Sequence, residues 1–85
     1  MKDYEYLFAT ALHARLRETI QAKRIFCKVN EKDQLYVEIK NEGVGMFVWT
    51  LDKFSERLIY GLSVLDAENE IRKEFRKFIF ERFFK

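Results

Sequence analysis

Residues 24–49 read RIFCKVNEKDQLYVEIKNEGVGMFVW, and this stretch decides the fold. Ile25, Cys27 and Val29 share one side of the segment 24–29, and apolar and polar residues alternate over 35–40. Both patterns have the two-residue period of a half-buried strand, and a third strand is expected over 44–49. The polar runs 30–34 and 41–43 are the turns between the strands. We expect Gly45 to mark a bulge or a close approach of the backbone. The stretch predicts a three-stranded antiparallel meander, whose middle strand turns Leu35, Val37 and Ile39 toward the core.

The flanking segments have the periodicity of amphipathic helices. A first helix is predicted over 3–22, with an apolar residue at every fourth position. A short helix is predicted over 53–60, with Asp52 as its N-cap and Gly61 at its end. Ser63 and Asp66 form a capping box for a last helix over 64–84. The apolar positions of the first helix are Tyr4, Phe8, Leu12, Leu16 and Ile20.

Together these elements predict a single domain over 1–85 with the order α-β-β-β-α-α. Helices on one face of a three-stranded antiparallel meander make an α+β two-layer sandwich. A chain of 85 residues has a thin core, so its 14 aromatic residues must supply much of the buried area. The residues expected to build the core are Phe8, Leu12, Leu16, Val37, Ile39, Phe75 and Ile79.

Composition excludes several classes of protein. Hydrophobic residues make up 48% of the chain and the net charge is only +2, which excludes a disordered chain and a strongly basic, histone-like protein. No apolar run reaches the roughly 18 residues of a membrane span, and the N-terminus has no secretory pattern. One cysteine cannot form an internal disulfide. We therefore expect a cytoplasmic protein that does not contact a membrane.

The residues most often used in catalysis have ordinary structural explanations here. His13 lies about a quarter turn from the apolar stripe of the first helix, so it is expected at the boundary of the core. Cys27 lies between Ile25 and Val29 on the inward side of its strand and is expected to be a buried, inert thiol. Because the chain contains no catalytic or metal-binding motif, we expect no enzyme activity, no cofactor, no metal and no small-molecule substrate.

The last helix carries the candidate site. Its expected inward stripe leaves out Phe80 and Phe84, which point about 140° and 180° away from Phe75 by the helical rotation. Basic residues surround these two rings on the face that should be wet. The candidate partner-binding residues are therefore Lys73, Arg76, Lys77, Phe80 and Phe84. The residues of the inward stripe are Ile71, Phe75, Phe78, Ile79 and Phe83.

Three interpretations of this face remain open. Phe80 and Phe84 could pack under the first helix or the 61–66 loop within one molecule. They could form a protein interface, most simply in a homodimer, because two-fold assemblies are common. They could also stack on nucleic-acid bases while the lysines and arginines contact phosphates. The second interpretation predicts an interaction module that binds a protein partner, and the third predicts a nucleic-acid-binding accessory protein. The small net charge weighs against the third.

Two resemblances bear on the fold and on the origin of the chain. The α-β-β-β-α order resembles that of the double-stranded RNA-binding domain, but that family's lysine-rich motif is replaced by the acidic run DAENE at 66–70. The opening MKDYEYLF, the polar hairpin and the closing FIFERFFK resemble small proteins of Gram-positive prophages in overall texture. This second resemblance implies a phage or prophage origin and no catalytic residues.

Overall fold

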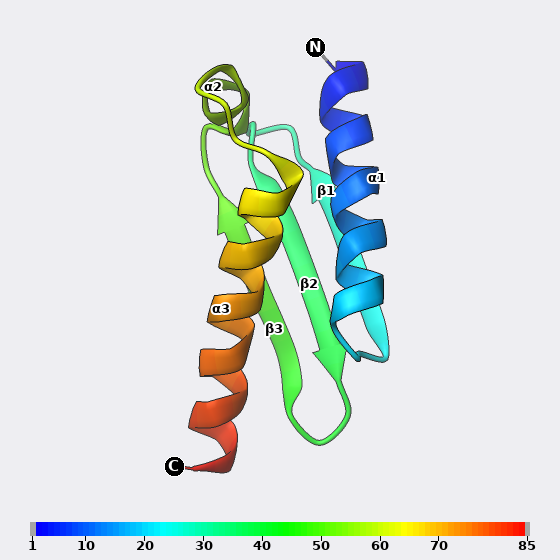
Figure 1. The fold of residues 1–85 in the computed structure, drawn as a ribbon, viewed down its shortest axis with the longest axis vertical. Coiled ribbons are helices and arrows are strands. Elements are labelled where there is room, and N and C mark those ends of the chain that lie inside the picture. The colour runs from blue at the N-terminus through cyan, green and yellow to red at the C-terminus, as the bar shows by residue number, and fades with distance from the viewer. Residues whose placement is uncertain (1, 85) are drawn as a thin grey trace.

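Three antiparallel strands form one sheet in the computed structural model, which describes residues 2–84 (Figure 1). The strands are β1 (Arg24–Val29), β2 (Leu35–Asn41) and β3 (Gly45–Leu51), in the order β1-β2-β3. Their register runs without interruption from Asn41↔Gly45 to Leu35↔Leu51, so Gly45 is not a bulge. It has a φ of 110°, and a Cβ there would lie 3.6 Å from Nη1 of Arg82. This is an ordinary van der Waals distance to a side chain, so the glycine is explained by its positive φ and not by the expected close approach of the backbone.

Three helices complete the predicted α-β-β-β-α-α order, which confirms the α+β fold class. They are α1 (Lys2–Thr19), α2 (Phe54–Ile59) and α3 (Val64–Phe83). Helices α1 and α3 cover one face of the sheet and run in the same direction, while α2 lies beyond one end of the strands (Figure 1). The first helix ends earlier than predicted, because Lys23 N donates to Lys40 O and Asn41 Nδ2 donates to Gln21 O. These two bonds hold residues 21–23 against the sheet.

The N-terminus of α2 corrects another prediction. Asp52 does not cap this helix, because its carboxylate accepts a hydrogen bond from Gln34 Nε2 at 2.8 Å. The residue at the N-cap position is Lys53, which has a φ of 55° and no side-chain capping bond. Asp33 caps the helix from the β1–β2 turn instead, since its carboxylate accepts from Ser55 N at 3.0 Å and from Ser55 Oγ at 2.7 Å. The cap therefore joins two turns that are distant in the sequence.

The other helix ends follow the prediction. Ser63 Oγ accepts from Asp66 N at 3.0 Å while the Asp66 carboxylate accepts from Ser63 N at 3.1 Å, which is the predicted capping box. Gly61 has a φ of 95° directly after α2, and Leu62 N donates to Arg57 O. A glycine adopts this left-handed conformation without the strain that a Cβ would cause.

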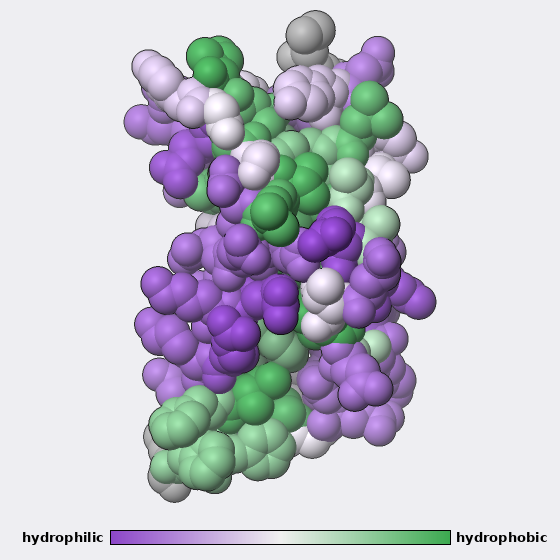
Figure 2. All heavy atoms as spheres, viewed as in Figure 1, coloured by the Kyte–Doolittle hydropathy of each residue, from purple (hydrophilic) through white to green (hydrophobic). Residues whose placement is uncertain are grey.

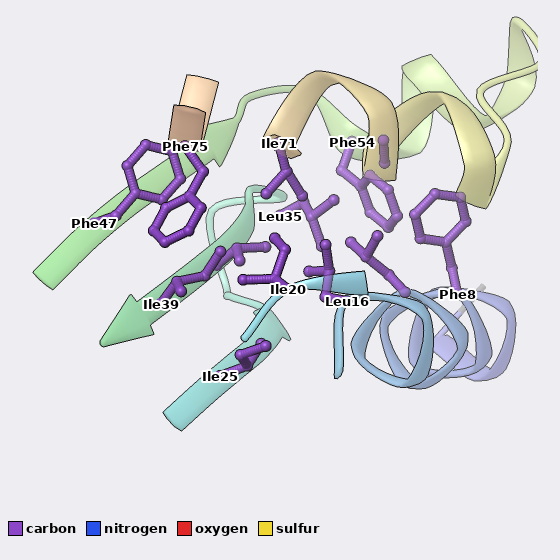
Figure 3. Packing of buried hydrophobic residues seen from close by; sticks show 13 residues of the cluster. Phe8, Leu16, Ile20, Ile25, Leu35, Ile39, Phe47, Phe54, Ile71 and Phe75 are labelled. Carbon is purple, nitrogen blue, oxygen red and sulfur yellow. The ribbon is translucent and has the colours of Figure 1, made fainter. Parts of the chain in front are cut away.

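The core lies between the sheet and the two long helices, and the rings of Phe47 and Phe75 lie at the opposite end of it from Phe8 and Phe54 (Figure 3). Six of the seven predicted core residues are buried, and the seventh, Ile79, is half-buried against the cluster. Tyr4 is exposed, since the first turn of α1 extends past the buried part of the stripe. Phe54 is fully buried and its ring lies 5.0 Å from that of Phe8, so α2 closes this end of the core.

Candidate functional site

Three phenylalanine side chains at the C-terminal end of α3 and directly after it are largely exposed. Phe80, Phe83 and Phe84 have 60%, 64% and 72% of their surface exposed, and we refer to them as the aromatic end. The rings of Phe80 and Phe84 stack on one another, with centroids 4.6 Å apart and planes 27° from parallel. Full burial of a phenylalanine side chain contributes about 1.5–3 kcal/mol, so each ring leaves more than half of that contribution unused.

The positions of these rings settle one interpretation of the sequence. Phe80 and Phe84 do not pack under α1 or the 61–66 loop, so the interpretation that the molecule covers them itself is wrong. Phe83 was expected to face the sheet, and this prediction is also wrong. It lies about 80° around the helix from Phe75, and α1 ends at Thr19, before it could cover this last turn of α3. Phe83 therefore joins the exposed rings.

The inward side of the same helical segment is firmly packed. The ring of Phe78 lies 5.4 Å from that of Phe47 on β3 and 6.3 Å from that of Phe75. The guanidinium of Arg82 lies over the outer face of Phe78, 4.6 Å from its centroid, and beside Gly45. Cation–π contacts of this kind contribute about 0.5–1 kcal/mol at exposed sites. The aromatic end is thus presented by a helix whose opposite side is anchored to the sheet.

Basic side chains continue the exposed surface toward the middle of α3. Lys73, Arg76 and Lys77 are exposed, and none of them forms a salt bridge among residues 2–84. We refer to these three residues as the basic face. The five residues singled out from the sequence therefore lie on one exposed side of one helix, as predicted. What sequence reasoning missed is Phe83, and the spacing of three from Phe80 could have indicated it.

His13 and Cys27 lie together at the outer edge of β1. They line a depression of about 510 Å³ between α1 and β1, with Tyr6, Ala9 and Val29 among its other walls. His13 Nε2 donates to the carbonyl oxygen of Ile25 at 2.9 Å, which matches the expected boundary position. Cys27 is half-buried and less enclosed than predicted, and desolvation raises the pKa of its thiol to about 12. A thiol with this pKa is a poor nucleophile at neutral pH.

Other kinds of site find little support in the part of the chain that is described. Residues 2–84 contain no group of three or more His, Cys, Asp or Glu side chains placed to hold a metal ion. None of the described helices is both long enough and apolar enough to cross a membrane. We found no significant match between this chain and any protein-family model, curated protein or solved structure. The geometry of α3 is therefore the main guide to function.

Proposed function

We propose that this protein is a non-enzymatic interaction module that binds a protein partner through the aromatic end of α3. The observation that carries the proposal is the exposure of Phe80, Phe83 and Phe84 side by side on an otherwise well-packed helix. Exposed apolar side chains that gather in one place are typical of interaction surfaces, whereas single ones are ordinary. Aromatic residues are also enriched among the side chains that contribute most to protein interfaces.

The basic face indicates the charge of the partner. Lys73, Arg76 and Lys77 lie beside the aromatic end and have no acidic partner among the described residues. Complementary charges at the rim of an interface mainly accelerate association and select the partner. A surface that combines exposed aromatic rings with adjacent lysines and arginines therefore fits a protein that presents an apolar and acidic patch.

The same basic face supports a second candidate function, which is nucleic-acid binding by an accessory protein. Phe80 and Phe84 would stack on bases while the three basic residues contact phosphates. In that case, replacing Lys73, Arg76 and Lys77 by Gln should make the affinity less sensitive to salt. On single strands, the slope of log affinity against log salt concentration should become shallower by about 0.7 per lost phosphate contact. We rank this function second because the rings stack on each other and the net charge is only +2.

The rest of the molecule supports an interaction module more than an enzyme. The pKa of Cys27, which lines the same depression as His13, is raised to about 12, and Nε2 of His13 is bonded to a backbone carbonyl. A general base needs an oriented partner and room for a substrate. A phage or prophage origin is also part of the proposal, and it rests only on the texture of the sequence.

Matched baits test the proposal. The wild-type protein, the Phe80→Ser/Phe84→Ser variant and a Phe26→Ser control are immobilised and exposed to a nuclease-treated extract of the source cells. Phe26 lies on the outer face of the sheet, on the side away from α3, and 41% of its surface is exposed. We expect a protein retained by the wild type and the control but lost from the double variant. Equal retention by all three baits, or binding only before nuclease treatment, would contradict a protein partner at the aromatic end.

A further inference from the structure

The two ends of the molecule carry opposite charge. The start of α1, the β1–β2 turn, α2 and the start of α3 lie at one end, and the end of α1, the β2–β3 turn and the end of α3 lie at the other (Figure 1). We call these the head (residues 2–7, 30–34 and 52–66) and the tail (residues 17–24, 40–46 and 76–84). The head has seven acidic and four basic residues, whereas the tail has seven basic and three acidic ones.

Part of this asymmetry matches the helix dipoles. Because α1 and α3 run in the same direction, both N-termini lie at the head, and each contributes about half a positive charge there. Together they offset roughly one of the three excess negative charges of the head, so the head stays acidic. The segments between the two ends carry four acidic and four basic residues, so they are neutral overall.

Exposed apolar side chains also gather at the two ends. Figure 2 shows apolar atoms at the head and over the last turns of α3, with a mainly hydrophilic band between them on the helix-covered face. Ten of the twelve large hydrophobic side chains exposed in the described residues lie at the ends. Those of the head are Tyr4, Tyr6, Leu7, Ile59, Tyr60 and Leu65, and those of the tail are Met46, Phe80, Phe83 and Phe84.

The head includes a notch that suits an aromatic ring. It has a volume of about 340 Å³ between the first turns of α1 and the last turn of α2, and Tyr4, Leu58 and Ile59 form its apolar walls. Glu5 lies at the same notch, with its Oε1 2.9 Å from Ser55 Oγ, so Glu5 and Asp33 share the one hydroxyl hydrogen of Ser55. The notch therefore combines apolar walls with a carboxylate, which is the chemistry that the aromatic end and the basic face would recognise.

We infer that the partner of the aromatic end is a second copy of this chain, packed antiparallel, with the tail of each copy on the head of the other. The inference rests on the proposed function and names its partner. Each contact would place phenylalanine rings on apolar residues and basic side chains beside acidic ones. The neutral middle would face its own counterpart. A two-fold axis through that middle makes both contacts equivalent and closes the assembly at two copies.

The size of the molecule favours this arrangement over the alternatives. The chain measures 41 × 22 × 20 Å, so one long face presents roughly 800–900 Å², about what each partner contributes to a standard interface. End-to-end contact offers roughly half of that area and would propagate into filaments. Tail-to-tail pairing would bring two basic ends together, and like charges across an interface disfavour association.

A complementation experiment by light scattering tests the inference. The head variant is Ile59→Ser/Tyr60→Ser, whose side chains are 81% and 82% exposed, and the tail variant is Phe80→Ser/Phe84→Ser. Circular dichroism checks that both variants remain folded, as expected for exposed positions. Val48→Thr is the matched control, because Val48 is a half-exposed residue of the outer sheet face, outside both ends.

The wild type and the control should have twice the mass of the 10.4 kDa chain, and each variant alone should be monomeric. An equimolar mixture of the two variants should recover dimers at least about tenfold tighter than either variant alone, since it contains one contact with an intact head and an intact tail. A head variant that dimerises like the wild type would overturn the inference in favour of tail-to-tail pairing.

A mixture that stays monomeric, a mass that grows without limit, or a monomeric wild type would also overturn the inference. The proposed function would survive these outcomes if the matched baits still retained a protein through Phe80 and Phe84. Conversely, baits that show no dependence on these two rings would remove the proposed function, and the inference with it.

Discussion

Arg15 Nε on α1 donates to Glu68 Oε1 on α3 at 2.8 Å, and the Glu68 side chain is completely buried. The second carboxylate oxygen, Oε2, lies 3.9 Å from Nη1 of Arg72, which is a salt bridge but not a hydrogen bond. Oε2 has no hydrogen-bond partner among the described residues. The carboxylate of Glu68 raises the pKa of Arg15 above its ordinary value. This ion pair therefore links α1 to α3 beside the apolar core that both helices share.

Removal of Arg15 should destabilise the protein more than removal of a neighbouring arginine. Arg15→Ala leaves the Glu68 carboxylate buried without its main partner, whereas Arg17→Ala removes only an exposed side chain. The double change Arg15→Ala/Glu68→Leu should recover part of the loss, because it also removes the buried charge. Urea denaturation of the three variants measures these differences. Equal midpoints for Arg15→Ala and Arg17→Ala would show that the ion pair does not contribute.

Asp33 provides a second test of the fold, at a position that local sequence rules do not identify. Asp33→Ala should cost about 1–2 kcal/mol of unfolding free energy, because Ser55 N loses its acceptor and α2 loses its cap. Asp33→Asn keeps an acceptor oxygen and tolerates the φ of 58°, so its cost should be clearly smaller. Asp52→Ala should cost less than Asp33→Ala, and the reverse order in thermal unfolding would contradict the cap.

Phe75 and Phe80 should respond differently to the same substitution. Phe75→Ala removes a buried ring that contacts Phe47, so it should cost roughly 3–5 kcal/mol. Phe80→Ala removes an exposed ring and should cost less than about 1 kcal/mol. Chemical denaturation at a protein concentration where the chain is monomeric separates the two. Similar costs at both positions would mean that the inward stripe of α3 is wrongly assigned.

Cys27 should make stability depend on pH in the alkaline range. Its pKa is about 12 in the folded protein and about 8.5 in an unfolded chain, so the unfolded state releases its proton first as the pH rises. The protonated thiol of Cys27 therefore makes its full contribution to stability below about pH 8.5. This contribution is lost as the pH rises from there toward 12. Cys27→Ala should flatten this part of the curve.

The same shift predicts the reactivity of Cys27. At pH 8 the thiolate fraction should be on the order of a thousandfold lower than in an unstructured cysteine peptide, so a disulfide reagent should label the folded protein correspondingly slowly. Labelling in denaturant should be fast. Native labelling at the rate of the free peptide would contradict the desolvated position of Cys27 on β1.

Periodic segments of the sequence predicted most of the fold. The alternation in 35–40 identified the buried and exposed faces of β2, and the serine–aspartate pair at 63 and 66 identified the start of α3. The errors occurred where a distant contact decides the outcome. Asp52 satisfies the local rule for an N-cap, but Asp33 reaches α2 from another turn, and no local pattern contains that information.

The candidate site was predictable for a similar reason and to a similar extent. Phe80 and Phe84 fall off the inward stripe by rotation alone, but the sequence left open whether the molecule covers them, and their exposure comes from the structure. Phe83 was misplaced because helical rotation does not show where α1 and the sheet stop. Glu68 was also missed. Its spacing places it on the inward side of α3, but only the structure shows that Arg15 meets it there.

Photo-crosslinking from the aromatic end tests the central claim most directly. Benzoylphenylalanine replaces Phe80 or Phe84 in one set of cells and Phe26 in a matched control set, and the adducts formed in the living cells are weighed by mass spectrometry. The account predicts one discrete protein adduct from positions 80 and 84 and none from position 26, with a second copy of this chain as the crosslinked protein. No adduct from positions 80 and 84, or an adduct made only of nucleic acid, would contradict it.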